Sequence, residues 1–265
     1  MVSLGNTKLL SIEIGDQCNL AGEHMKCPIS IRKHNKEYGA LTIEDIIVVI
    51  HDAIKLGFRG MVGFQYYNEP MLYIDRIQKV IERVPEVDYL LWTNGTLLDR
   101  SIEKNEILTL FKQVVITCYN KEELSFYEVL KEYYKNICIV TWELDNRKEM
   151  YEKGVRNIYG CMRPVWEIPI DYYGNIHLCC RDWKESYKIG NIKKDKLEII
   201  LNNSAYQNVL GSVYKNHLDL NVCPELCKRC DNPMYMPDIG HRFEDMARRL
   251  RKRESAVKFP SEFIN

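Results

Sequence analysis

The chain has 265 residues, which suffices for one substantial domain or for a domain with a smaller appendage. Apolar residues make up 46% and charged residues 28% of the chain, with 37 Lys+Arg against 37 Asp+Glu, so the formal net charge is +0. This balance favours a soluble globular protein over a binder of nucleic acid or anionic membranes, which would carry a basic excess. The sequence contains neither a transmembrane-length apolar run nor a signal-peptide pattern, so we expect a cytoplasmic protein.

The ten cysteines are informative in a chain expected in a reducing compartment. There, cysteine-rich chains more often bind metal or perform redox chemistry than form disulfides. Cys18 and Cys27 lie near the start, and six more lie between residues 161 and 230. Cys118 and Cys138 sit in apolar, strand-like runs and are expected to be buried small hydrophobes.

The first 145 residues alternate strand-like and helix-like segments. Strands are expected over residues 8–15, 60–67, 87–93, 113–119 and 136–142, and helices over 41–57, 71–84, 100–111 and 121–134. In the first helix, Thr42 and Asp45 form a capping box and Gly57 provides the stop. Such alternation predicts βαβ units around a parallel sheet, with function at the carboxyl ends of the strands. The loop after the first strand is long for such a fold, which favours a functional loop.

The pattern changes after residue 150. A hairpin that turns at Gly174 is expected, followed by a helix around 194–211 and the cysteine-rich segment "CPELCKRC" over 223–230. This predicts a small metal-stapled module. The predicted division is a barrel domain over 1–150, the module over 151–235, and a C-terminal helix and tail over 236–265.

Cysteine spacing in the module points to a metal site. Cys227 and Cys230 form a C-x2-C pair, which can hold one metal ion or one edge of a cluster. Upstream, Cys161 is separated by twelve residues from Gly174, which is separated by four from Cys179. Spacing alone leaves a structural four-cysteine zinc site open.

This cysteine pattern, with "GNI" after the hairpin, resembles the twitch module of radical S-adenosylmethionine enzymes, a shorter relative of the SPASM module. The resemblance implies one auxiliary [4Fe-4S] cluster. Its implied ligands are Cys161, Cys179, Cys227 and Cys230. Cys180 and Cys223 are then spare, and either could replace a neighbouring ligand.

The stretch "CNLAGEHMKCP" resembles the family's cluster loop, whose usual form is C-x3-C-x2-C. Cys18 and the Cys27-Pro pair match the two ends, while His24 stands in the place of the middle cysteine. The resemblance implies that Cys18, His24 and Cys27 hold a [4Fe-4S] cluster that binds S-adenosyl-L-methionine and generates a 5′-deoxyadenosyl radical. Three interpretations stay open: His24 is the third ligand, the cluster is held otherwise or has three irons, or the site is inactive.

Two further motifs follow the next two strands. "YYNEPML" (66–72) resembles the family's "GGEP-L" motif, and "LWTNGTLLD" (91–99) resembles its "TNG-LL" element. The resemblance implies that backbone carbonyls of the first motif, in which Asn68 replaces a glycine, and Glu69 receive the ammonium of S-adenosylmethionine. It also implies that Thr93 and Asn94 contact the nucleoside or carboxylate. Each motif alone is an ordinary turn. Their order, together with the cluster loop and the module, predicts an α/β partial (β/α)6-type TIM barrel with a C-terminal twitch module of hairpin plus helix.

Within the family, the sequence most resembles enzymes that oxidise a cyclitol alcohol. This implies a radical S-adenosylmethionine oxidoreductase that abstracts a C–H hydrogen from a small carbohydrate or cyclitol-like substrate, with the auxiliary cluster as electron acceptor. Arg147, in an "NR" pair shared with those enzymes, is the candidate catalytic residue. Asp171, Tyr172 and His177 are candidates for the proton acceptor.

The expected partners are a small-molecule substrate or short peptide and an electron donor such as flavodoxin or ferredoxin, with no nucleic acid and no membrane. Two alternative functions remain. One is radical modification of a peptide, and the other is a non-catalytic scaffold that keeps a structural metal site.

Overall fold

The protein is described here by a computed structural model, which covers residues 2–23, 27–31, 37–141, 157–182, 184–230 and 233–234. Within these residues, all eight strands join one sheet in the order β5-β4-β3-β2-β1-β6-β7-β8. The strands are β1 Leu9–Ile12, β2 Met61–Gly63, β3 Asp88–Thr93, β4 Gln113–Cys118, β5 Ile137–Thr141, β6 Glu167–Ile170, β7 Asn175–His177 and β8 Lys188–Asn191.

Parallel pairing dominates the sheet. Strands β1 to β5 pair in sequence order, and β6 pairs parallel with the other side of β1, so that Leu10 lies between Val62 and Ile168. Strands β7 and β8 then add antiparallel. Because β5 and β8 form the two ends of the strand order, the sheet is not closed. The predicted partial barrel is confirmed, and its sixth parallel strand is the first strand of the hairpin.

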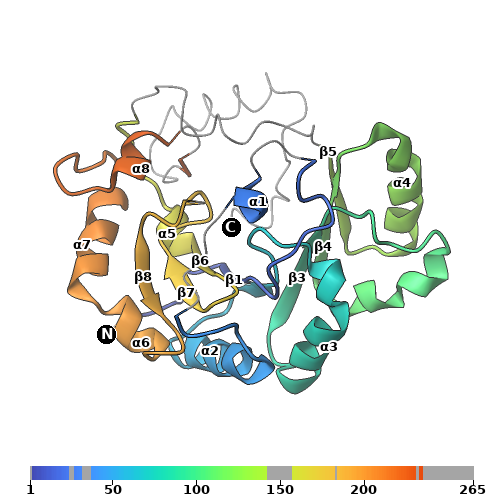
Figure 1. The fold of residues 1–265 in the computed structure, drawn as a ribbon, viewed down its shortest axis with the longest axis horizontal. Helices are drawn as coiled ribbons and strands as arrows, with labels where there is room; N and C mark the ends of the chain where they lie inside the picture. The colour runs from blue at the N-terminus through green and yellow to red at the C-terminus, as the bar shows by residue number, and fades with distance from the viewer. Residues whose placement is uncertain are drawn as a thin grey trace.

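Most of the α-helices cover the sheet from its outer side (Figure 1). The α-helices of the barrel are α1 Pro28–Ile31, α2 Ile43–Lys55, α3 Ile74–Arg83 and α4 Leu124–Tyr133, and those of the module are α5 Arg163–Trp166, α6 Leu197–Leu201, α7 Ser204–Val213 and α8 Glu225–Lys228. In this view α2, α3, α4, α6 and α7 form the periphery, whereas the short α1 lies near the centre. None of the helices described is long and apolar enough to cross a membrane.

Helix α2 forms as its sequence predicts. The Thr42 side chain accepts a hydrogen bond from Asp45 N at 3.1 Å, and Asp45 Oδ2 accepts one from Thr42 N at 2.8 Å, which completes the capping box. Lys193 lies 3.6 Å from Asp45 Oδ2. Burial acts to raise the pKa of Asp45, but the cap hydrogen bonds and Lys193 lower it below its usual value. Gly57, at φ +89°, follows the end of the helix.

Two expected helices differ from the prediction. Residues Ile102–Leu110 form the 3-10 helix η2, interrupted at Asn105, whose side chain accepts from Asp99 N and donates to Asp99 O and Ser101 O. This side chain therefore competes with the helical ladder. The helix expected over 194–211 is divided into α6 and α7, because Asn203 caps the second helix by accepting from Ala205 N at 2.8 Å.

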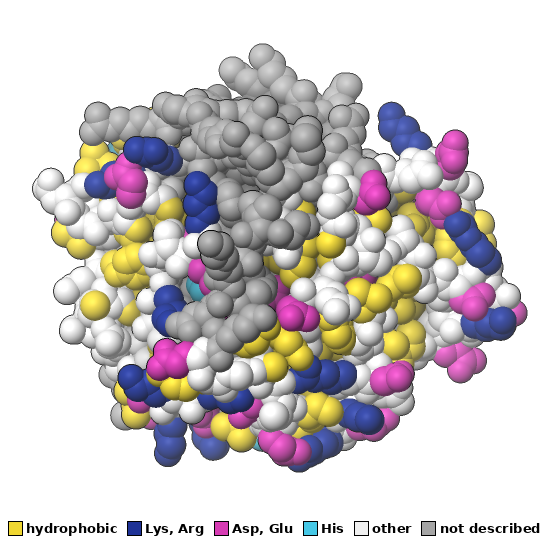
Figure 2. Space-filling view, in the orientation of Figure 1, with side chains coloured by type: hydrophobic (Ala, Val, Ile, Leu, Met, Phe, Trp, Pro, Cys, Tyr) yellow, Lys and Arg dark blue, Asp and Glu magenta, His cyan; other side chains and the backbone are white. Residues whose placement is uncertain are grey.

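Short 3-10 turns, η1 Pro70–Tyr73 and η3 Lys121–Glu123, precede α3 and α4. The predicted boundary near residue 150 and the C-terminal helix over 236–265 lie outside the described residues. Charged side chains of both signs are interspersed on the face drawn in Figure 2, which agrees with the balanced composition.

Candidate iron–sulfur and cofactor site

The loop after β1 passes close to the loop after β2. A Cβ atom on Gly15 would lie 2.0 Å from Cζ of Tyr73, so only glycine lets the chain pass there. Gln17 N donates to the Tyr73 hydroxyl at 3.1 Å, and Glu69 N donates to Gln17 O at 2.9 Å. These contacts hold the start of the "CNLAGEHMKCP" loop against the "YYNEPML" motif.

Glu69 links the ends of β2 and β3. Its Oε1 accepts from the Thr93 hydroxyl at 2.6 Å and from Met71 N at 3.0 Å, and its Oε2 accepts from Asn94 N at 2.9 Å. The side chain is 3% exposed, and burial raises the pKa of Glu69 although these hydrogen bonds oppose the rise. Glu69, whose carboxylate the motif predicts to contact the cofactor, therefore also connects the loops after β2 and β3 in the absence of any cofactor.

Asn94 extends this link to the cluster loop. Its Nδ2 donates to Asn19 Oδ1 at 2.9 Å and lies 4.0 Å from the Cys18 sulfur, while its Oδ1 accepts from Thr96 N at 3.0 Å. Asn68 instead closes its own turn, since its Nδ2 donates to the carbonyl oxygen of Phe64 at 3.2 Å. The Asn94 side chain thus positions the loop that carries Cys18.

Cys18 and Cys27 meet at this edge of the sheet. Burial raises the pKa of Cys18 to about 11, and the charges of Glu69 and Cys27 act in the same direction. A bound cation would reverse this preference, because metals coordinate the thiolate. The structure therefore gathers the described cysteines of the predicted cluster loop with the predicted cofactor-contact residues. His24 and Arg147 lie outside the described residues.

The module's four predicted ligands also gather. Burial raises the pKa of Cys179 and Cys227 above the usual thiol value, and each is raised further by the charge of Cys161. The charge of Cys227 also raises the pKa of Cys179, and the charge of Cys230 raises the pKa of Cys227. The Cys161 sulfur accepts a hydrogen bond from Met234 N at 3.2 Å, the kind of contact that tunes an iron–sulfur cluster.

The described sulfurs do not lie at the spacing of a preformed four-thiolate zinc site. In a four-thiolate zinc site, Zn–S bonds of about 2.3 Å place neighbouring sulfurs only about 3.8 Å apart. Within the described part of the chain, the one set of three or more candidate ligand atoms that all lie within 4.8 Å of one another contains no cysteine. A cluster binds each thiolate to a different iron, which requires wider spacing.

The two spare cysteines differ in their surroundings. Cys223 is buried beside α8, and the charge of its thiol acts on Cys227. Cys180 lies beside Arg163 and Glu167, with Arg163 Nη1 3.4 Å from the Cys180 sulfur, and its charge also acts on Cys179. Burial raises the pKa of Cys180 to about 12, and Glu167 raises it too. Neither Arg163 nor Glu167 was predicted from the sequence, although charged residues beside a cysteine-rich hairpin were a usable signal.

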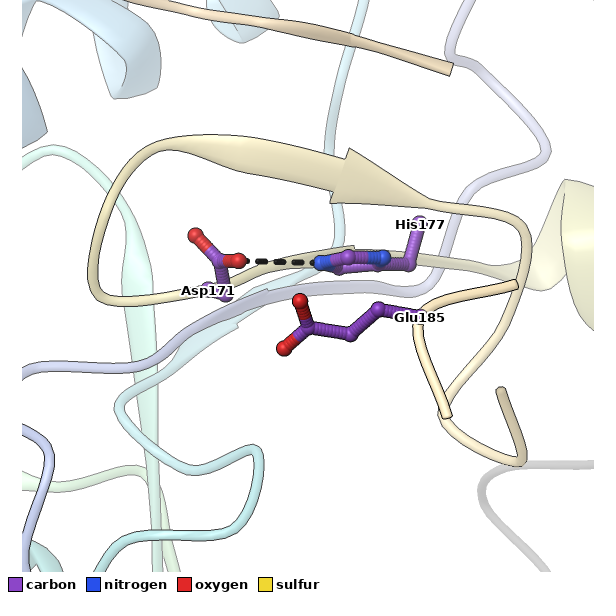
Figure 3. A group of neighbouring side chains, drawn as sticks. All are labelled: Asp171, His177 and Glu185. Atoms are coloured by element: carbon purple, nitrogen blue, oxygen red, sulfur yellow. Dashed lines mark hydrogen bonds and ion pairs between the residues drawn. The ribbon is translucent and has the colours of Figure 1, made fainter. Parts of the chain in front are cut away.

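A second group occupies the hairpin (Figure 3). The carboxylate of Asp171 accepts four hydrogen bonds, from Tyr173 N, from Asn175 N and Nδ2, and from His177 Nε2 at 3.0 Å. Ligand atoms of Asp171, His177 and Glu185 lie within 4.8 Å of one another. Because its lone pairs are used, Asp171 serves the turn at Gly174, whose φ is +81°.

The hairpin is tied to the barrel through Glu13, a buried carboxylate after β1 that the sequence analysis did not single out. Its Oε1 accepts from Tyr67 N at 3.3 Å and its Oε2 from Tyr172 N at 3.1 Å. The Tyr67 hydroxyl donates to the carbonyl oxygen of Cys180 at 2.5 Å. The loop after β2 therefore bridges the cofactor edge and the cysteines of the module.

Comparisons with known proteins show what this chain is similar to. Residues 161–231 match the family model of SPASM, described as an iron–sulfur cluster-binding domain. The fold is that of the crystal structure of BtrN in complex with AdoMet and 2-DOIA, with a TM-score of 0.68 and 21% identity over 88% of this chain and 95% of that one. It is also that of native anSMEcpe with bound AdoMet and Kp18Cys peptide, with a TM-score of 0.53 and 14% identity over 93% and 98% of the two chains.

A particular enzyme stands among the relatives. The chain is 22% identical over 237 residues to the S-adenosyl-L-methionine-dependent 2-deoxy-scyllo-inosamine dehydrogenase of Niallia circulans, covering 84% of this chain and 92% of that enzyme. The predicted resemblance to radical S-adenosylmethionine enzymes with a twitch/SPASM-like module is confirmed. The matched family model is one of iron–sulfur cluster-binding domains, and both of these solved structures hold AdoMet.

Proposed function

We propose that this chain is a radical S-adenosylmethionine oxidoreductase that oxidises an alcohol carbon of a small polyhydroxylated substrate, of the cyclitol or aminocyclitol type. The observation that carries the proposal is the convergence of Cys18 and Cys27 with Glu69, Thr93 and Asn94 at one edge of the sheet. The dehydrogenase relative, whose name includes such a substrate, supports the substrate class.

In this proposal the chain's own residues hold and orient the cofactors. Cys18, His24 and Cys27 would hold the N-terminal cluster, and Asn94 would fix the loop through its bonds to Asn19 and its contact with Cys18. When bound, the N-terminal cluster and S-adenosylmethionine supply the hydrogen-abstracting radical, and the auxiliary cluster supplies an electron acceptor.

Glu69 contributes a buried negative charge where the cofactor's ammonium would lie. Three donors already fix its carboxylate, so it is preorganised and loses little conformational freedom on binding. Arg147 is proposed to contact the substrate. The four module cysteines Cys161, Cys179, Cys227 and Cys230 would hold the auxiliary cluster, and a flavodoxin- or ferredoxin-like protein would donate the initial electron.

Iron counting with product analysis tests the proposal. Anaerobically reconstituted wild type should contain about eight irons per chain, falling to about four in Cys18→Ala and in His24→Ala. Cys138→Ala is the matched control, since Cys138 is half-buried in β5, a strand at one end of the sheet, and is not a predicted ligand; it should keep all the iron. Dithionite and S-adenosylmethionine should yield 5′-deoxyadenosine with wild type and the control only.

Other outcomes separate the alternatives. About four irons in every protein without 5′-deoxyadenosine would contradict the proposal and favour a scaffold with one structural cluster. A peptide substrate is the second candidate, supported by the fold shared with peptide-bound anSMEcpe. It would be favoured if 5′-deoxyadenosine forms but polyols and aminocyclitols neither stimulate its formation nor become oxidised.

A further inference from the structure

A guanidinium group lies inside the cysteine module. Arg163 follows Cys161 by two positions, and its Nη1 lies 3.4 Å from the sulfur of Cys180, the neighbour of Cys179. Burial disfavours its charge, but the surrounding thiols and Glu167 hold the pKa of Arg163 above its usual value. An arginine is in any case charged throughout the accessible pH range, so the module contains a permanent cation.

The described residues compensate this cation only in part, through the buried carboxyl of Glu167 and the Cys180 sulfur. The Nε of Arg163 is buried and has no hydrogen-bond partner among the described residues, and the Cys180 sulfur is a weak acceptor. Burying a charge without full compensation is unfavourable. An anionic group held by Cys161 and Cys179 would add to the compensation that the buried Glu167 gives.

Cys180 is held by its own partners. Its thiol hydrogen-bonds to the buried Glu167, and the Arg163 guanidinium also contacts the sulfur. Glu167 also interacts with the Ser11 hydroxyl on β1. Arg163 and Glu167 thus both contact Cys180, and the charges of Cys161 and Cys179 also act on the guanidinium.

We propose that Arg163 is a positioning residue that raises the reduction potential of the auxiliary cluster, by fixing a positive charge beside two of its cysteine ligands. This inference rests on the proposed function, in which that cluster accepts an electron. Reduction adds one negative charge to the cluster, and a nearby cation stabilises the reduced state more than the oxidised state. The electron would come from the carbon-centred substrate radical, whose hydroxyl proton leaves to water as the carbonyl forms.

The test measures the auxiliary cluster by itself. In a Cys18→Ala/Cys27→Ala background, only the module can hold a cluster, and its midpoint potential is read by an EPR-monitored redox titration. Arg163→Gln should lower the equilibrium constant for reduction at least tenfold, which for one electron is about 59 mV. Arg163→Lys should shift it less, because the positive charge remains.

Two matched controls accompany these variants. Lys188→Gln removes a positive charge from an exposed position on β8 of the same module and should leave the potential unchanged. Cys180→Ser should keep about four irons, because Cys180 is not a ligand in this assignment. Iron content and far-UV circular dichroism establish that each variant is folded and loaded.

Several results would overturn the inference. A loaded Arg163→Gln cluster with the wild-type potential would refute it and leave the proposed function standing. If Lys188→Gln shifted the midpoint potential as much as Arg163→Gln does, the effect would be one of net charge and not of the position of Arg163. Loss of iron in Cys180→Ser would show that Cys180 is a cluster ligand, and the assumed position of Arg163 relative to the ligands would then be wrong. Zinc in place of iron in the background protein would instead refute the proposed electron acceptor itself.

Discussion

Replacing Glu69 separates its structural role from its cofactor role. In Glu69→Ala, three donors lose their acceptor: the Thr93 hydroxyl, Met71 N and Asn94 N. A buried donor left unsatisfied costs about 1–3 kcal/mol, and the Thr93 hydroxyl can rotate to another acceptor. We expect a destabilisation of about 4 kcal/mol for the cofactor-free protein.

Glu69→Gln should be milder. The single amide oxygen can replace Oε1 and keep the bonds from Thr93 and Met71, but the amide nitrogen then faces Asn94 N, which is also a donor. Loss of that bond is partly offset because the buried negative charge is removed, so we expect about 2 kcal/mol. For a domain of this size, this corresponds to a decrease in Tm of roughly 4–8 °C, against roughly 8–16 °C for Glu69→Ala.

The assay is thermal unfolding of the cofactor-free protein, followed by tryptophan fluorescence. Glu44→Gln is the matched control, because Glu44 is 66% exposed and pairs with Arg83 on the surface. It should change stability by less than about 1 kcal/mol. Glu69 variants that unfold within 1 °C of wild type would refute the structural role, and S-adenosylmethionine affinity measured on the same variants then reports the cofactor role alone.

Three further predictions concern other parts of the chain. Gly15→Ala should destabilise the protein and weaken S-adenosylmethionine binding measured by calorimetry, because its Cβ would overlap the Tyr73 ring; unchanged binding would contradict the proposed close approach. Asp45→Asn should cost about 1 kcal/mol at pH 7 in urea unfolding. The α2 cap lowers the pKa of Asp45, although partial burial opposes this. The contribution of the Asp45 carboxylate to stability is therefore present above about pH 4 and is lost as the pH falls through the pKa of Asp45 in the folded protein. A difference in stability between Asp45→Asn and wild type that does not change with pH would argue against this. Cys223→Ser should keep the module's iron while Cys227→Ser loses it, and the reverse pattern would exchange their roles.

The sequence was sufficient for the local elements with strong patterns. The capping residues Thr42 and Asp45 define the start of α2, and short apolar runs define the parallel strands, because propensity, periodicity and capping act between near neighbours. Motif spacing also identified residues that lie together in the fold, since loops that follow parallel strands meet at one edge of the sheet. Asn105 and Asn203 interrupted expected helices through side-chain bonds that periodicity does not reveal.

Only the tertiary structure decided the partners of these groups. Glu69 and Asn94 were predicted as cofactor contacts, but their bonds to Thr93 and Asn19 depend on how strands β2 and β3 and the cluster loop pack together. The pairing of β6 with β1, far apart in the sequence, made the hairpin a continuation of the barrel sheet. The same packing placed the charge of Arg163 beside the cysteines. Sequence records which groups can interact, but burial and distance determine how strongly they do, and both arise only when distant segments meet.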